Sequence, residues 1–162
     1  MRRTVLAMAG VIGGMALLSG CGAMMLPLAA VYRDASGSPR ALLRPCGDDL
    51  IQGLGLTGAP AEDDSDRNRS GWKAPGKRRG SDADFPLFSP PETWQARTAG
   101  KQRLVSAYTY ELAFGKGEFN YEYTGIVTFR AADLDRLGPG QVWADDRAMS
   151  RGEFEKLAAD SC

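Results

Sequence analysis

The side chains that could carry chemistry are limited first by what the chain lacks. Its 162 residues include 20 basic side chains, 20 acidic side chains and three cysteines, but no histidine. Without histidine the chain cannot form a Ser-His-Asp triad, a Cys-His dyad or an imidazole metal site. The formal net charge of zero argues against nucleic acid as a partner, because nucleic acid is bound mainly by neutralising its phosphates.

Two further patterns could in principle do chemistry. Adjacent aspartates at 48–49, 63–64 and 145–146 could bind calcium or act as a hydrolase pair. They lack the spacing of a calcium-binding loop, and adjacent side chains of an extended chain point to opposite faces, so solvated turns are favoured. The letters GLGLTG at 53–58 fit GxGxxG, but Pro60 and an acidic run follow where a phosphate-binding helix would begin. We therefore predict no catalytic residue, no metal site and no cofactor.

The N-terminus has the three-part layout of a secretory signal. Residues 1–4 carry two arginines, residues 5–18 are uncharged, and small residues follow. The sequence Leu18-Ser19-Gly20-Cys21 resembles the lipobox of bacterial lipoproteins. That resemblance implies lipid attachment to the Cys21 thiol and signal cleavage between Gly20 and Cys21, so that Cys21 becomes the mature N-terminus.

The resemblance further implies a protein held at the extracytoplasmic face of the plasma membrane, or at the outer membrane of a double-membrane bacterium. We expect a signal peptide over 1–20, a lipidated cysteine with a short tether over 21–27, and a single domain over 28–162. Two alternatives stay open: an ordinary signal peptide cut elsewhere, and an uncharged run at 4–32 kept as a transmembrane helix. The 15 arginines against 5 lysines are typical of a GC-rich, actinomycete-type genome.

Cys46 and Cys162 are the two cysteines that remain once Cys21 is assigned to lipid. Disulfides persist outside the cytoplasm, so we predict that these two pair. The bond would close a loop of more than 100 residues and hold the C-terminus against the first hairpin. A redox or metal site is the alternative, but two cysteines without CxxC spacing or histidine do not make a usual zinc centre.

The first half of the mature chain predicts strands followed by a long loop. Segments 28–33 and 40–44 flank a turn-rich stretch and predict a hairpin. Segment 49–56 predicts a third strand whose residues Leu50, Leu54 and Leu56 share one face. Residues 57–91 are rich in glycine, serine, proline and charge, which predicts a long polar loop that is partly disordered.

The second half contains the strongest periodic signal. Residues 104–130 alternate aromatic and polar side chains around a glycine turn, which predicts a long hairpin. Its aromatic face could stack sugars or bases, but leucine, valine and phenylalanine share it, which favours core packing. A short helix at 131–137 and a strand at 141–144 are expected next. Ser150 and Glu153 match a capping box that opens a C-terminal helix.

Together these patterns predict a mainly β (α+β) fold: a small antiparallel sheet or sandwich with a C-terminal helix and one disulfide. We expect a non-catalytic binding or accessory module of the cell envelope, with the bilayer as one partner and an envelope protein or wall polymer as another. A carboxylate-dependent hydrolase of a wall glycan or peptide, and a small solute-binding lipoprotein, are the alternatives.

Overall fold

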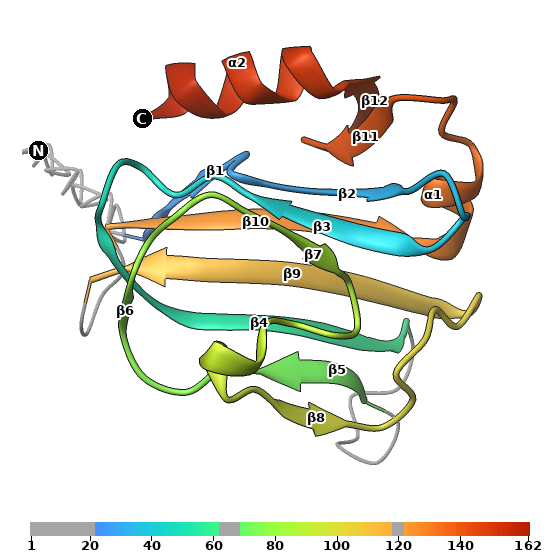
Figure 1. Ribbon diagram of the computed structural model, residues 1–162, viewed down its shortest axis with the longest axis horizontal. Helices are drawn as coiled ribbons and strands as arrows, with labels where there is room; N and C mark the ends of the chain where they lie inside the picture. Colours follow the sequence, from blue (N-terminus) through green and yellow to red (C-terminus); the bar gives the residue numbers. More distant parts are fainter. Residues whose placement is uncertain (1–21, 62–68, 118–121) are drawn as a thin grey trace, which may run out of the picture.

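The computed structural model describes residues 22–61, 69–117 and 122–162, and it has a mainly β (α+β) fold, as predicted. Its described strands form two sheets (Figure 1). The first sheet contains, in spatial order, β1 (Met24–Leu26), β10 (Tyr123–Arg130), β9 (Tyr108–Lys116), β4 (Leu50–Pro60), β5 (Ser70–Lys73) and β8 (Arg97–Ala99), with β6 (Arg78–Arg79) beside the start of β4. The second contains β12 (Arg147–Ser150), β11 (Gln141–Ala144), β2 (Ala29–Arg33), β3 (Pro39–Leu43) and β7 (Ala83–Pro86).

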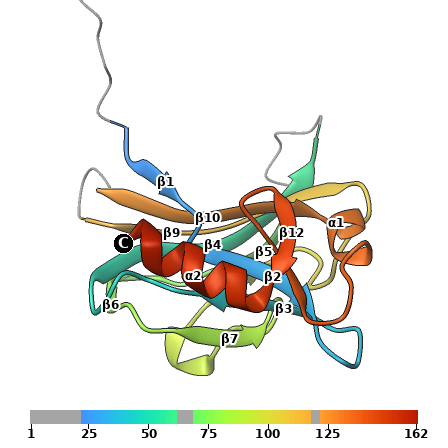
Figure 2. The same ribbon diagram turned by 90° about the horizontal axis from the view of Figure 1, so that it is seen from above.

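The second sheet lies between the first sheet and the C-terminal helix α2 (Arg151–Ser161), which is drawn at the top of Figure 1. Seen from above, α2 crosses in front of β2 (Figure 2). Consecutive residues 29–31 of β2 and 41–43 of β3 are buried, because both faces of these strands are covered. A strand buried on both faces needs a continuous apolar run rather than alternation. The predicted hairpin of β2 and β3 is therefore confirmed, with the two strands paired antiparallel.

The long hairpin is formed by β9 and β10, which pair antiparallel over their full described length. Its alternation is confirmed, because every second side chain faces the core: Tyr110, Leu112, Phe114, Tyr123, Val127 and Phe129 are buried. Burial of these rings confirms core packing over a stacking platform. The hairpin turn, residues 118–121, lies outside the described residues.

Strand β4 corrects the face predicted for its leucines. Leu54 and Leu56 are buried, but Leu50 is 57% exposed and its neighbour Ile51 is buried instead. The register against β9 shifts between Gln52 and Gly55, at a bulge where Gly53 has φ +64°. An extra residue in one strand exchanges the two faces beyond it.

The stretch 57–91 is not the single polar loop that its composition predicts. It contains the end of β4 together with β5, β6 and β7, and Trp72 and Phe85 are buried in the core. These strands form because neighbouring strands supply hydrogen-bond partners for their backbone, which the local sequence does not indicate. Residues 62–68, which hold Asp63 and Asp64, lie outside the described residues.

The expected tether is also shorter than predicted. Residues 24–26 form β1, which pairs in parallel with the start of β10. Cys21 and Gly20 lie outside the described residues, so lipid attachment and cleavage there stay predictions. Within the described residues, no helix has the length and apolar character needed to cross a membrane.

The C-terminal segment confirms the remaining elements. The short helix α1 (Ala131–Asp135) and β11 are present, and β12 follows where no strand was expected. The capping box is formed: Glu153 donates its backbone N–H to Ser150 Oγ, and Ser150 donates its own to Glu153 Oε2. The predicted Cys46–Cys162 disulfide joins the chain after β3 to the end of α2, with the two Cα atoms 5.4 Å apart.

Candidate functional site: a cationic groove

An open groove of about 930 Å³ runs along β4, β5 and β8 of the first sheet. Its charged lining residues are Arg69, Lys73 and Arg97, and among the described residues no acidic side chain lines it. The side chains of Lys73 and Arg97 are exposed. Strand pairing brings these cations together from separate parts of the chain.

Cross-strand register explains how the groove is built. Gly55 lies opposite Lys73, which lies opposite Arg97, so the three form one row across the sheet. Directly paired residues have Cβ atoms about 5 Å apart, so the lysine and arginine can reach one anionic group together. The next row along, Thr57, Gly71 and Ala99, offers only small side chains.

Strands β4 and β5 approach closely beside the groove at two glycines, because larger residues do not fit there. A Cβ atom on Gly55 would lie 2.9 Å from the Trp72 carbonyl oxygen. Gly71 has φ +126°, and a Cβ atom there would overlap the Leu56 carbonyl. Both glycines are required by the close approach of β4 and β5, and Gly71 exposes backbone to the groove beside Lys73.

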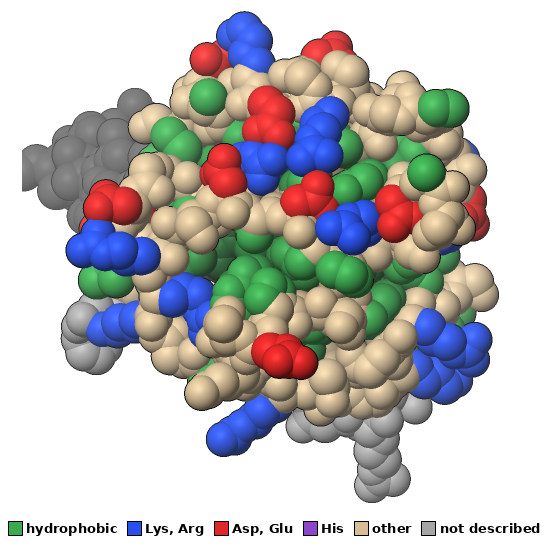
Figure 3. All heavy atoms as spheres, viewed as in Figure 1, with side chains coloured by type: hydrophobic (Ala, Val, Ile, Leu, Met, Phe, Trp, Pro, Cys, Tyr) green, Lys and Arg blue, Asp and Glu red, His purple; other side chains and the backbone are tan. Residues whose placement is uncertain are grey.

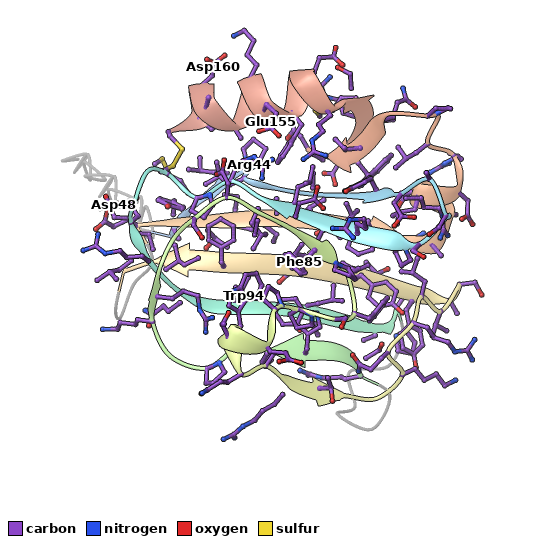
Figure 4. The ribbon with its side chains drawn as sticks, in the orientation of Figure 1. Arg44, Asp48, Phe85, Trp94, Glu155 and Asp160 are labelled. Carbon is purple, nitrogen blue, oxygen red and sulfur yellow. A yellow bond between two sulfur atoms is a disulfide. The ribbon has the colours of Figure 1, made fainter. Side chains whose placement is uncertain are left out.

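Strand β5 is fixed in place from its other side. Trp72 points into the core, where its indole Nε1–H donates to the Leu87 carbonyl at 2.8 Å. It packs edge-on against Phe85, and Trp94 packs against Phe85 with ring centroids 4.9 Å apart (Figure 4). The guanidinium of Arg78 lies 5.7 Å from the Trp94 ring centroid. This aromatic cluster anchors the strand that presents Lys73.

The charges of Lys73 and Arg97 are not balanced by the described residues. No acidic side chain among them forms an ion pair with Lys73 or Arg97, although such pairs hold many other arginines of the described chain. Clustered like charges with no counter-charge raise the local concentration of anions. The arrangement can therefore hold phosphate or carboxylate groups.

The face of the second sheet beneath α2 shows the opposite arrangement, with acidic and basic side chains interleaved (Figure 3). Asp84 accepts hydrogen bonds from Tyr32 Oη at 2.8 Å, Arg40 Nε at 2.9 Å and a guanidinium nitrogen of Arg151 at 3.1 Å. Burial acts to raise the pKa of Asp84, but the hydrogen bonds from Tyr32 and Arg40 outweigh it and hold that pKa below its usual value. Every charge in this cluster has a partner.

Arg44 and Glu155 form the strongest pair of that face (Figure 4). Two guanidinium nitrogens of Arg44 donate to the two carboxylate oxygens of Glu155, both at 2.6 Å. This hydrogen bonding lowers the pKa of Glu155. The pair ties α2 to the end of β3, and bidentate geometry of this kind adds directional strength. We assign the charged cluster to holding α2 in place rather than to ligand binding.

The two described aspartate pairs, at 48–49 and 145–146, do not converge. Asp48 pairs with Arg79 at 2.5 Å, and Asp49 accepts a hydrogen bond from Tyr123 Oη at 3.2 Å. Asp145 and Asp146 occupy the turn between β11 and β12 with φ +50° and +54°, the left-handed conformation of a two-residue hairpin turn. Among the described residues, no group of three or more His, Cys, Asp or Glu side chains could hold a metal ion.

The GLGLTG letters lie inside β4, which continues to Pro60, so no helix begins directly after them. Gly53 forms the bulge, Gly55 allows the approach of β5, and a Cβ atom on Gly58 would overlap the Tyr110 ring. Each glycine therefore has a packing reason. Of the three, Gly53 also lines the groove.

Sequence reasoning missed the groove, because Lys73 and Arg97 are far apart in the chain. No family model, curated protein or solved structure matches this chain. The alternation Gly71-Trp72-Lys73 was the one available signal, since it is the small-apolar-charged pattern of a strand with one open face. Function is therefore inferred from the groove and from the N-terminal motif.

Proposed function

We propose that the protein is a lipid-anchored binding module of the bacterial cell envelope, held outside the cytoplasm through Cys21, whose groove takes an anionic ligand without transforming it. The lipobox resemblance at 18–21 supports the anchor. One observation supports the ligand class above all: Lys73 and Arg97 lie in one cross-strand row of the groove, and no acidic side chain of the described residues lines it.

The chemistry of the groove favours phosphate or carboxylate groups repeated along a wall polymer. A guanidinium offers a planar fork of donors and an ammonium offers a compact point charge, and both bind such groups. The groove is open, so a chain could lie over Gly71 and beside the row of Lys73 and Arg97. Such a ligand would be held mainly by charge, and its affinity would fall as salt rises.

The groove is tested by calorimetric titration of the mature chain with a glycerol-phosphate polymer and, separately, with polyglutamate. Lys73→Gln and Arg97→Gln are each expected to weaken binding about tenfold, the effect of losing one charge-assisted hydrogen bond. Lys156→Gln is the matched control, because Lys156 lies on α2 and pairs with Asp160. An equal loss in the control, or no binding of either polymer, would contradict the assignment.

The anchor is tested by metabolic labelling with a fatty acid analogue. Cys21→Ala is expected to abolish labelling and release the protein from the membrane fraction. Cys46→Ala is the control, since it removes a cysteine that belongs to the disulfide and should leave labelling intact. Labelling that persists in Cys21→Ala would refute lipid attachment at that residue.

A further inference from the structure

Large apolar side chains are exposed at one end of the molecule. Among the described residues, the large hydrophobic side chains that are mostly exposed are Met24 at 65%, Met25 at 60% and Leu50 at 57%. All the other large apolar residues of the described chain are buried or partly buried. Strand register places all three at one end of the first sheet.

Met24 pairs with Tyr123, which pairs with Lys116, which pairs with Ile51, the neighbour of Leu50. This row crosses β1, β10, β9 and β4 at the end of the first sheet where β10 begins and β9 ends (Figure 1). Adjacent strands are about 4.8 Å apart, so Met24 and Leu50 are separated by about 15 Å. We call Met24, Met25 and Leu50 the apolar tip.

The apolar tip lies next to the proposed anchor. Only Gly22 and Ala23 separate Cys21 from Met24, so the Cα atoms of Cys21 and Met24 are at most about 11 Å apart. The headgroup layer of one leaflet is itself about 5–8 Å deep. A lipid on the Cys21 thiol would thus bring the tip into contact with that layer.

We propose that the apolar tip inserts into the bilayer interface and fixes how the domain stands on the membrane. This inference rests on the proposed lipid attachment to Cys21. The tip then adds buried apolar contact to an anchor that would otherwise be a flexible tether.

Charges at this end indicate that the contact is apolar rather than electrostatic. Lys116 pairs with Asp49 at 3.3 Å and with Glu122 at 3.0 Å. Arg79, opposite Leu50, pairs with Asp48 at 2.5 Å. With both cations neutralised, insertion is expected to be similar on phosphatidylcholine and phosphatidylglycerol vesicles.

Methionine oxidation tests the tip with the protein's own residues. The lipidated mature protein on phosphatidylcholine vesicles is treated with hydrogen peroxide, which converts each thioether to a sulfoxide and water, and sulfoxides are counted by mass spectrometry. The reference is residues 21–162 with Cys21→Ser in solution, which keep every described contact. Oxidation of Met24 and Met25 is expected to slow roughly tenfold on vesicles, because it follows exposure. Met149, 3% exposed, should react slowly in both.

Two variants sharpen the readout. Leu50→Met adds a reporter at the tip and should be protected like Met24. Ala35→Met is the matched control, because Ala35 is exposed in the β2–β3 turn at the far end of the molecule, and it should keep its solution rate. A lipidated protein whose tip methionines slow no more than Ala35→Met overturns the inference alone. A chain with no lipid at Cys21 and tip methionines at their solution rate overturns the anchor as well.

Discussion

Removing the Cys46–Cys162 disulfide is expected to lower the free energy of unfolding by about 4–5 kcal/mol. The bond joins residues that are 116 apart in sequence. Cross-linking a loop of that length removes about 16 cal/mol/K of entropy from the unfolded chain, or about 4.8 kcal/mol at 25 °C. That loss approaches the whole stability of a small domain, so the reduced protein would be only marginally folded.

Other contacts of α2 determine whether the helix stays docked when the disulfide is removed. Phe154 and Ala158 are buried against the second sheet, and Glu155 is held by Arg44. We therefore expect α2 to stay docked after the bond is removed, and unfolding to stay cooperative. With a urea slope of about 2 kcal/mol/M, the midpoint would fall by about 2 M with little change in slope.

Urea titration followed by circular dichroism measures the effect on Cys46→Ala, Cys162→Ala and the double variant. Each single change already breaks the bond, so all three variants should lose about the same stability. A double variant that loses twice as much as either single would mean that each cysteine acts through its own packing. A loss below about 1 kcal/mol in all three would refute the loop-closure reasoning.

Two further predictions concern packing and pH. Gly58→Ala is expected to lower the free energy of unfolding by about 1–3 kcal/mol, because its Cβ atom would overlap the Tyr110 ring. Gly152→Ala in α2 is the control: its Cβ atom meets no other atom, so it should be neutral or stabilising by up to about 1 kcal/mol. Thermal melts compare the two variants. The hydrogen bonds from Arg44 lower the pKa of Glu155, so this pair stabilises the fold above the unfolded pKa of the carboxyl and is lost as the pH falls below about 4. Glu155→Gln should therefore flatten the melting temperature between pH 5 and pH 3, and an unchanged slope would contradict the assignment.

The elements that could be predicted are those whose own residues carry a regular local pattern. The β9–β10 hairpin alternates over both strands, so its buried face could be identified without knowing what covers it. The helix cap at Ser150 depends on contacts within four residues. The disulfide followed from counting cysteines once one was assigned to lipid. Each of these predictions needed only short-range information or a count.

The elements that were missed depend on partners elsewhere in the chain. Strand β5 is four residues long with a glycine inside it, and it exists because β4 and β8 pair with it on both sides. Strand β12 follows an Asp-Asp turn. The turn was not recognised because glycine or asparagine indicates a left-handed hairpin turn more clearly than aspartate does. The composition of residues 57–91 predicted a polar loop, yet Trp72 and Phe85 from that stretch pack with Trp94 from the following segment.

The candidate groove and the apolar tip could not be predicted for the same physical reason. The exposure of Leu50 depends on the bulge at Gly53, since a regular β4 would have placed it on the face of Leu54. The row of Lys73 and Arg97 depends on the register of three strands. A shift of one residue in either strand would turn one cation away from the other. Surface chemistry on a sheet is thus set by register, and register is fixed by contacts on the opposite, buried face.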